Sequence, residues 1–321
     1  MSRYPFVTMH SFGMRNPSEL HDVFRARLDA FSQELPRVHK GDAGALQKAR
    51  VAARRLRELL PLLQLDRRTT RKLQRRLRKV AGRLGAVREL DVLMTLVDDL
   101  GRSDRYGSIA LQQLRDAVAA ERKTARERLH AKLSLAKLER LARRLERAGG
   151  HLEDGFEKHG RRRDAASTHA AVWALEARIT RRAARLAETL AVAGTVYASE
   201  QLRGVRIAMK KLRYAAELLP QPRDPRVTAD ISSLKTAQDL LGRLRDLEVL
   251  VERGRQIQAS SGPPDLTAWR DLGSLVHAVE DDCRQLHASF VHERAMLVAI
   301  ADRMAGAPAR TARIERRAAG Q

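Results

Sequence analysis

Cysteine is almost absent from the 321-residue chain, in which Cys283 is the only one. A single thiol excludes an internal disulfide framework and a thiolate metal cluster. Long apolar runs are also missing, including from the N-terminal stretch "MSRYPFVTMHSFGMRNPSE". The sequence therefore predicts neither a signal peptide nor a helix of about 20 apolar residues that would span a bilayer. We expect a soluble, cytoplasmic protein with no membrane partner.

Aromatic residues make up only 4% of the chain, and alternating β-branched segments and hairpin dipeptides such as Asn-Gly are missing. Apolar residues instead recur every three or four positions, which is typical of helices with one buried face. We therefore predict an all-α protein. The expected helices cover about 17–35, 43–64, 70–84, 86–100, 108–148, 168–192, 198–219, 226–241, 243–259 and 266–304.

Acidic residues are too few to balance the basic ones. The chain has 62 Lys and Arg against 39 Asp and Glu, a formal net charge of +23. This excess repels itself in a compact fold unless a polyanion neutralises it. Only 11 of the basic residues are Lys, and Arg is the better phosphate binder because its planar fork matches phosphate oxygens bidentately. Composition thus indicates a polyanionic partner, although a genome rich in G and C would also favour Arg.

Two sequence blocks occur twice, in the same order. The block "ARVAARRLRELL" is matched by "VRIAMKKLRYAAELL", and "LGAVRELDVL" by "LGRLRDLEVL". Glycines, charges and Ser/Thr interrupt the helical period at 148–168. We therefore predict two homologous helical halves, 15–150 and 165–305, followed by a flexible basic tail at 306–321. In the second block of each copy, Gly85 and Gly242 are predicted to mark helix ends or tight turns. The i,i+3 spacing predicts local ion pairs at Arg88–Asp91 and Arg245–Glu248.

Each repeat carries a row of basic residues along one helix face. At about 100° per residue, Arg50, Arg54 and Arg57 fall within about 60° of one another, opposite an apolar face. Like charges at this spacing destabilise an isolated helix, so a row without acids indicates an anion bound along it. The predicted polyanion-binding residues of both repeats and nearby helices are Arg50, Arg54, Arg55, Arg57, Arg71, Arg75, Arg78, Lys79, Arg126, Arg203, Arg206, Lys210, Lys211 and Arg213.

Together these motifs resemble the CHAD domain, the conserved-histidine α-helical domain, from about Pro17 to Arg303. The resemblance implies two pseudo-symmetric four-helix-type bundles around a basic central cavity. It also implies non-catalytic binding of inorganic polyphosphate and association with polyphosphate granules. The family usually places a histidine three residues before the Arg of each "RV" or "RI" motif, where this chain has Gln47 and Arg203. Metal chelation by those histidines therefore has no basis here, whereas Arg203 adds a permanent charge.

Nucleic acid is the alternative partner, because a basic channel attracts any phosphodiester chain. Against it, Tyr214 is the sole aromatic residue beside a basic motif, so platforms for base stacking are few. Hydrolysis of triphosphate or polyphosphate is a further alternative, but the ExExK strand of CYTH triphosphatases, an HExxH pair and a P-loop are all missing. We predict a binding protein without catalytic residues, metal site or cofactor. The sequence leaves its oligomeric state open.

Overall fold

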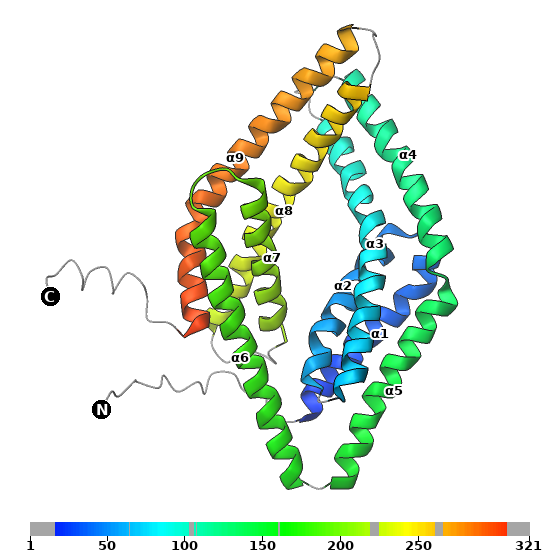
Figure 1. Cartoon of the computed structure of the whole chain (residues 1–321), viewed down its shortest axis with the longest axis vertical. Helices are drawn as coiled ribbons and strands as arrows, with labels where there is room; N and C mark the ends of the chain where they lie inside the picture. Colours follow the sequence, from blue (N-terminus) through cyan, green and yellow to red (C-terminus); the bar gives the residue numbers. More distant parts are fainter. Residues whose placement is uncertain are drawn as a thin grey trace, which may run out of the picture. The chain divides into compact units, whose positions relative to one another are not determined.

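The computed structural model describes residues 17–63, 65–102, 106, 108–159, 161–218, 225–260 and 266–306, with side chains for all of these except 17–19, 108, 151–172 and 260. This part of the chain confirms the all-α prediction, since it contains nine α-helices, one short 3-10 helix and no strand (Figure 1). The helices are α1 (Pro17–His39), α2 (Ala43–Leu59), η1 (Leu60–Leu62), α3 (Arg67–Gly101), α4 (Ser108–Lys132), α5 (Leu135–His159), α6 (Arg161–Ala193), α7 (Ser199–Ala216), α8 (Pro225–Ser260) and α9 (Leu266–Ala305).

Aspartate caps begin the two helices that carry the first repeat. Oδ1 of Asp42 accepts a hydrogen bond from the Ala45 N–H at 2.8 Å at the start of α2. Asp66 accepts from the N–H groups of Arg68 and Thr69, both at 2.9 Å, at the start of α3. A side-chain oxygen that satisfies these first-turn donors stabilises a helix by about 1 kcal/mol. The capped ends fix where the basic faces of α2 and α3 begin.

Several predicted helix boundaries are wrong. Gly85 and Gly242 lie inside α3 and α8, because a glycine within a helix costs only about 1 kcal/mol relative to alanine and the buried leucines on either side offset it. The helix expected at 108–148 is divided instead at 133–134, where the Ser134 carbonyl accepts from Lys137 and Leu138. The interruption expected at 148–168 is helical apart from residue 160, which the structure does not describe.

The described chain forms two compact units. The N-terminal unit comprises His21–Lys158 together with Leu244–Gln285, and the C-terminal unit comprises residues 17–20, 159–243 and 286–306. Helices α8 and α9 therefore each contribute one segment to each unit. This division differs from the predicted halves 15–150 and 165–305, because residues 244–285 cluster with the first repeat. The pseudo-twofold relation of the repeats stays a prediction, and the predicted tail lies outside the described residues after Gly306.

In the N-terminal unit, apolar faces of α1 to α5 pack together with the end of α8 and the start of α9. Phe24 and Phe31 of α1 are fully buried, as are Leu77 and Leu84 of α3. Polar contacts join the neighbouring helices at the edges of this core. They are Arg115 to Asp98 between α4 and α3, Arg253 to Glu121 between α8 and α4, Arg255 to Glu280 between α8 and α9, and Tyr106 to Asp282 between the α3–α4 connection and α9.

In the C-terminal unit, α7 packs against α6. The core is completed by the first part of α8 and the last part of α9, and Met209, Leu212 and Phe290 are fully buried in it. Three contacts tie the helices together: Arg182 donates to the Lys211 carbonyl at 2.6 Å, Arg294 donates to the Leu190 carbonyl at 3.1 Å, and Arg303 pairs with Asp230 at 2.6 Å. Within the described residues of both units, no helix is long and apolar enough to cross a membrane.

Candidate functional site

The first candidate surface is the α2 row, made of Arg50, Arg54, Arg55 and Arg57. All four side chains are half-buried, because the opposite face of α2 lies in the core. Nη1 of Arg50 lies 3.5 Å from Oε1 of Gln47, and its Nε lies 3.4 Å from the point where a Cβ on Gly85 would be. Nη2 of Arg57 lies 3.7 Å from the carboxylate of the buried Glu58. The α2 row is thus held in place by packing and by a nearby acid.

The second surface is the α3 row, made of Arg71, Arg75, Arg78 and Lys79. These four side chains are exposed, and within the described chain none of them forms an ion pair or a hydrogen bond. The side chain of Gln74, which lies among them on α3, donates to the Arg57 carbonyl on α2 at 3.5 Å. The two rows therefore lie on adjacent helices of one unit. The α3 row offers four uncompensated cations.

Arg126 of α4 was predicted to bind the polyanion, but its guanidinium already has an acidic partner. Asp91 of α3 accepts from Nε of Arg122 at 2.6 Å and from Nη2 of Arg126 at 3.3 Å, and the Asp91 side chain is only 3% exposed. The predicted local pair of Asp91 with Arg88 is wrong, because the Asp91 carboxylate turns towards α4. Arg126 is therefore fixed by a buried acid, with 29% of its side chain left exposed.

The α7 row of the C-terminal unit consists of Arg203, Arg206, Lys210, Lys211 and Arg213. Arg213 is only 12% exposed, since it pairs with Glu217, donates to Gln238 on α8 at 3.1 Å and lies 4.9 Å over the Tyr214 ring. Arg203 is exposed but pairs with Glu200 at 3.0 Å. Arg206 and Lys210 are half-buried, whereas Lys211 is exposed. The equal spacing seen in the sequence thus covers residues with different roles, and Arg213 serves mainly to join α7 to α8.

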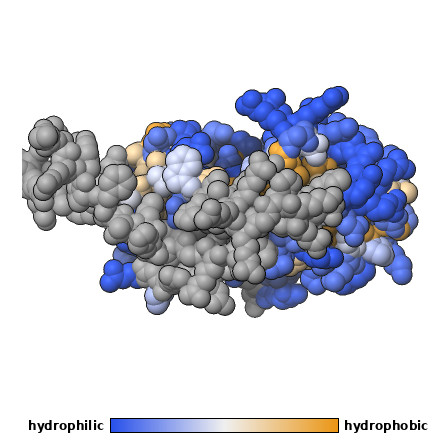
Figure 2. All heavy atoms as spheres, turned by 90° about the horizontal axis from the view of Figure 1, so that it is seen from below, coloured by the Kyte–Doolittle hydropathy of each residue, from blue (hydrophilic) through white to orange (hydrophobic). Residues whose placement is uncertain are grey.

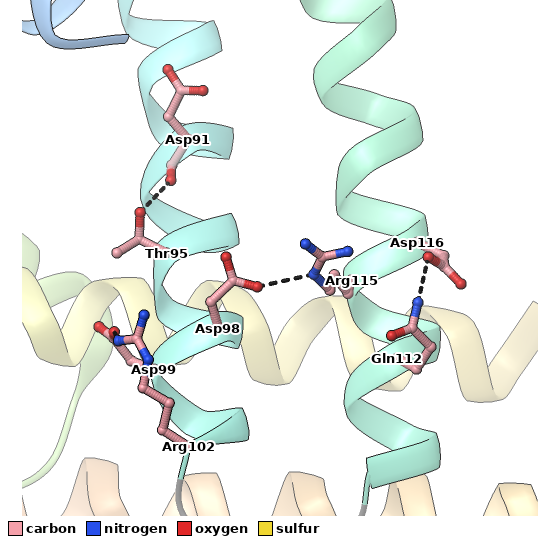
Figure 3. A network of polar contacts seen from close by, with 8 residues as sticks. All are labelled: Asp91, Thr95, Asp98, Asp99, Arg102, Gln112, Arg115 and Asp116. Atoms are coloured by element: carbon pink, nitrogen blue, oxygen red, sulfur yellow. Dashed lines mark hydrogen bonds and ion pairs between the residues drawn. The ribbon is translucent and has the colours of Figure 1, made fainter.

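Acidic residues that limit the positive charge gather on the C-terminal half of α3 and the start of α4. Figure 3 shows Asp98 pointing to Arg115, and Asp99 beside Arg102, which directly follows the end of α3. The two distances are 2.9 Å and 2.6 Å. The charge of α3 therefore changes along its length, from the unpaired cations of its first turns to compensated pairs near its end. On the face seen in Figure 2 the described surface is mainly hydrophilic, with smaller apolar areas.

A further set of cations, which we call the α5 row, lies outside the predicted binding residues: Lys137, Arg140, Arg144 and Arg147. Three of them are exposed and Arg144 is half-buried. The same i,i+3 and i,i+7 spacing that revealed the α2 row would have revealed them. They were missed because they belong to neither copy of the repeated motifs. The helix carrying them was also expected to begin much earlier, at residue 108.

Histidines and acids form no obvious metal site in the described part of the chain, where no three His, Cys, Asp or Glu side chains are grouped to hold an ion. The rings of His39 and His130 meet edge to face, with centroids 5.8 Å apart. Gln47 and Arg203 stand at the positions of the usual motif histidines, the first half-buried and the second exposed. The chemistry of the described rows is therefore that of fixed guanidinium and ammonium groups.

Comparison with known proteins agrees with this arrangement of helices. The sequence model of the CHAD domain matches residues 22–255. The chain belongs to the CHAD domain family. The match contains the α2, α3, α5 and α7 rows and ends within α8. The resemblance inferred from the repeated motifs is thereby confirmed.

Two solved structures share the CHAD fold. The CHAD domain from the plant Ricinus communis is 22% identical, with a TM-score of 0.54 and 91% of each chain covered. PptA from Streptomyces chartreusis is 18% identical, with a TM-score of 0.57, and the alignment covers 89% of this chain and 98% of PptA. At these identities the likeness shows the fold. No curated protein matched the chain.

Proposed function

We propose that this CHAD protein binds inorganic polyphosphate without catalysing its breakdown, and that this binding localises it to polyphosphate granules. The observation that carries the proposal is the α3 row. It presents four exposed cations with no acidic partner in the described chain, next to the fixed arginines of α2. A linear polyanion laid along both rows would neutralise charges that otherwise destabilise the helices.

The choice of polyphosphate over nucleic acid rests on what surrounds the cations. Single-stranded nucleic acids are held by aromatic side chains on which the bases stack, as well as by a basic groove. Tyr214, the sole aromatic residue next to a basic motif in the sequence, is only 8% exposed and lies under Arg213. A chain made of phosphate alone needs no such platform, because guanidinium groups bind its oxygens directly.

A competition experiment tests the partner. Long-chain polyphosphate and single-stranded DNA are titrated against the full chain at equal phosphate concentration and equal salt. We expect polyphosphate to bind more tightly, with log affinity falling linearly as log salt rises. Tighter binding of DNA would instead favour the nucleic-acid alternative.

Two matched variants test the α3 row. The α3 variant carries Arg71→Gln, Arg75→Gln, Arg78→Gln and Lys79→Gln. The paired control removes four cations that already have carboxylate partners, through Arg102→Gln, Arg115→Gln, Arg255→Gln and Arg284→Gln. Each phosphate contact contributes about 0.7 to the salt slope of a single strand, so loss of four contacts should lower the slope by about 3 in the α3 variant. The paired control should keep most of its slope.

Equal losses in the two variants would mean that net charge alone sets the affinity, which would contradict the proposed site. Circular dichroism must show that both variants remain helical. Release of orthophosphate or shortened chains during the incubation would contradict the proposed absence of catalysis. In cells that accumulate polyphosphate, a fluorescent fusion of the unmodified chain should form foci on granules, and the α3 variant should be diffuse.

A further inference from the structure

One face of α5 carries a row of cations to which a polyanion could bind, although α5 lies outside the repeated motifs. At about 100° per residue, the four members of the α5 row fall within an arc of about 80°, and at 1.5 Å per residue they extend over about 15 Å of helix. Glu139 and Glu146 lie on the flank of this arc, about 80° or more from any member of the row. The row is thus as continuous as the α2 row that the motifs define.

The packing of α5 keeps this face in solvent. Leu138, Leu141 and Leu145 are buried, and each lies about 100° or more around the helix from Arg140 and Arg147. Near the C-terminal end of the row, a Cβ on Gly149 would lie 3.0 Å from the Phe24 ring of α1, so the two helices approach closely there. Rotating α5 to bury the row would expose the three leucines, at a cost of about 1.5–3 kcal/mol for each side chain. The fold therefore fixes the row outwards.

The cations of the α5 row have no acidic partners within the described chain. The one polar contact among them is a hydrogen bond from Arg147 Nε to the Arg143 carbonyl of the same helix, at 3.4 Å. By contrast, exposed arginines elsewhere in the same unit, such as Arg102 and Arg115, hold carboxylates at 2.6 Å and 2.9 Å. Like charges at this spacing disfavour the helix, so an anion along the row would stabilise it.

From these observations we infer that the α5 row is a second polyphosphate-binding surface, which allows one protein molecule to hold two chains and link them. The inference rests on the proposed function, because it takes the same ligand. Polyphosphate is the occupant that the surface fits, since the described part of α5 at 135–150 carries no aromatic residue on which a base could stack. A protein with two such surfaces would add cohesion to a granule as well as join it.

A bridging assay tests this inference. Long-chain polyphosphate is fixed to beads, the protein is bound and washed, and a fluorescent second polyphosphate chain is added at moderate salt. The α5 variant, with Lys137→Gln, Arg140→Gln, Arg144→Gln and Arg147→Gln, keeps helix propensity because Gln is close to Lys and Arg on that scale. We expect the unmodified chain and the paired control to capture the second chain. The α5 variant should bind the beads but capture at least about tenfold less of the second chain, the loss expected for about 1.4 kcal/mol.

Each other outcome has a separate meaning. Capture by the α5 variant equal to that of the unmodified chain overturns the inference and leaves the proposed function standing. A folded α5 variant that no longer binds the beads would show that α5 belongs to the first site, which also overturns a second surface. Failure of the unmodified chain to bind the beads would overturn the proposed function itself.

Discussion

Replacing Asp91 with Asn should destabilise the protein more than any equally conservative change of a surface acid. The Asp91 side chain is 3% exposed and is the common partner of Arg122 and Arg126 on α4. Asparagine keeps the size of the side chain and one acceptor oxygen but removes the negative charge. The change therefore isolates the ionic part of the contact between α3 and α4.

The magnitude follows from the exposure of the three partners. Removing one member of a fully buried ion pair costs about 3–5 kcal/mol, because the other charge is left without compensation. Here Arg122 and Arg126 keep 33% and 29% of their side chains in solvent, so water can hydrate the freed charges. The remaining loss is that of a hydrogen bond to a charged group, about 1.5–3 kcal/mol. We expect a decrease of about 2 kcal/mol in the free energy of unfolding.

Thermal unfolding followed by circular dichroism measures the effect, with Asp98→Asn as the matched control. Asp98 and Arg115 also join α3 to α4, at 2.9 Å, but their side chains are 42% and 47% exposed (Figure 3). An exposed pair contributes about 0–1 kcal/mol, so the control should melt close to the unmodified protein. Equal melting temperatures for the two variants would refute the argument that burial of Asp91 gives the contact its strength.

Two more predictions concern α8 and α9. Gly254→Ala should lower the free energy of unfolding by about 1–3 kcal/mol, because the new Cβ would lie 2.7 Å from Cγ2 of Val276. Gly242→Ala is the control: no atom lies within 4 Å of its Cβ, so this change should raise the free energy of unfolding by about 0.5–1 kcal/mol. Similar shifts in the melting temperatures of both variants would contradict the close packing of α8 on α9. Burial lowers the pKa of His287 below its usual 6.5, so its contribution to stability is complete above that value and is lost as the pH falls towards the lowered pKa. Melting between about pH 7.5 and pH 5.5 should therefore depend less on pH in His287→Phe, and an unchanged dependence would exclude His287 as its source.

The sequence was sufficient for the helical class because apolar residues at three- and four-residue spacing leave few alternatives. It failed at Gly85 and Gly242, where the local preference to end a helix is overridden by packing along α3 and α8. Ser134, a good N-cap residue, was a signal for the start of α5 that the longer apolar pattern obscured. Helix boundaries depend on local preferences of about 1 kcal/mol, whereas the all-α fold class depends on the apolar pattern of the whole chain.

The sequence predicted where the basic rows lie, but not which of their cations already have a partner in the fold. Spacing placed Arg126 and Arg213 among the cations open to a ligand. Their acceptors include Asp91, 35 residues earlier in the chain, and Gln238, 25 residues later. No helical period relates residues at those separations, because only the packing of helices brings them together. The α5 row differs from these two residues. Its spacing is visible in the sequence, but only the fold shows that its cations have no acidic partner in the described chain.

The division of α8 and α9 between the two units has a consequence for the order of folding during synthesis. The N-terminal unit needs Leu244–Gln285 to complete its packing. A ribosome must therefore release most of the chain before the first helices can finish folding, although domains generally fold as units from the N-terminal end. Until then Glu121 of α4 and Tyr106 lack their partners Arg253 and Asp282. A gene fragment ending near residue 150 would encode the first motif copy without two segments of its core, so duplication in the sequence does not provide two independently foldable pieces.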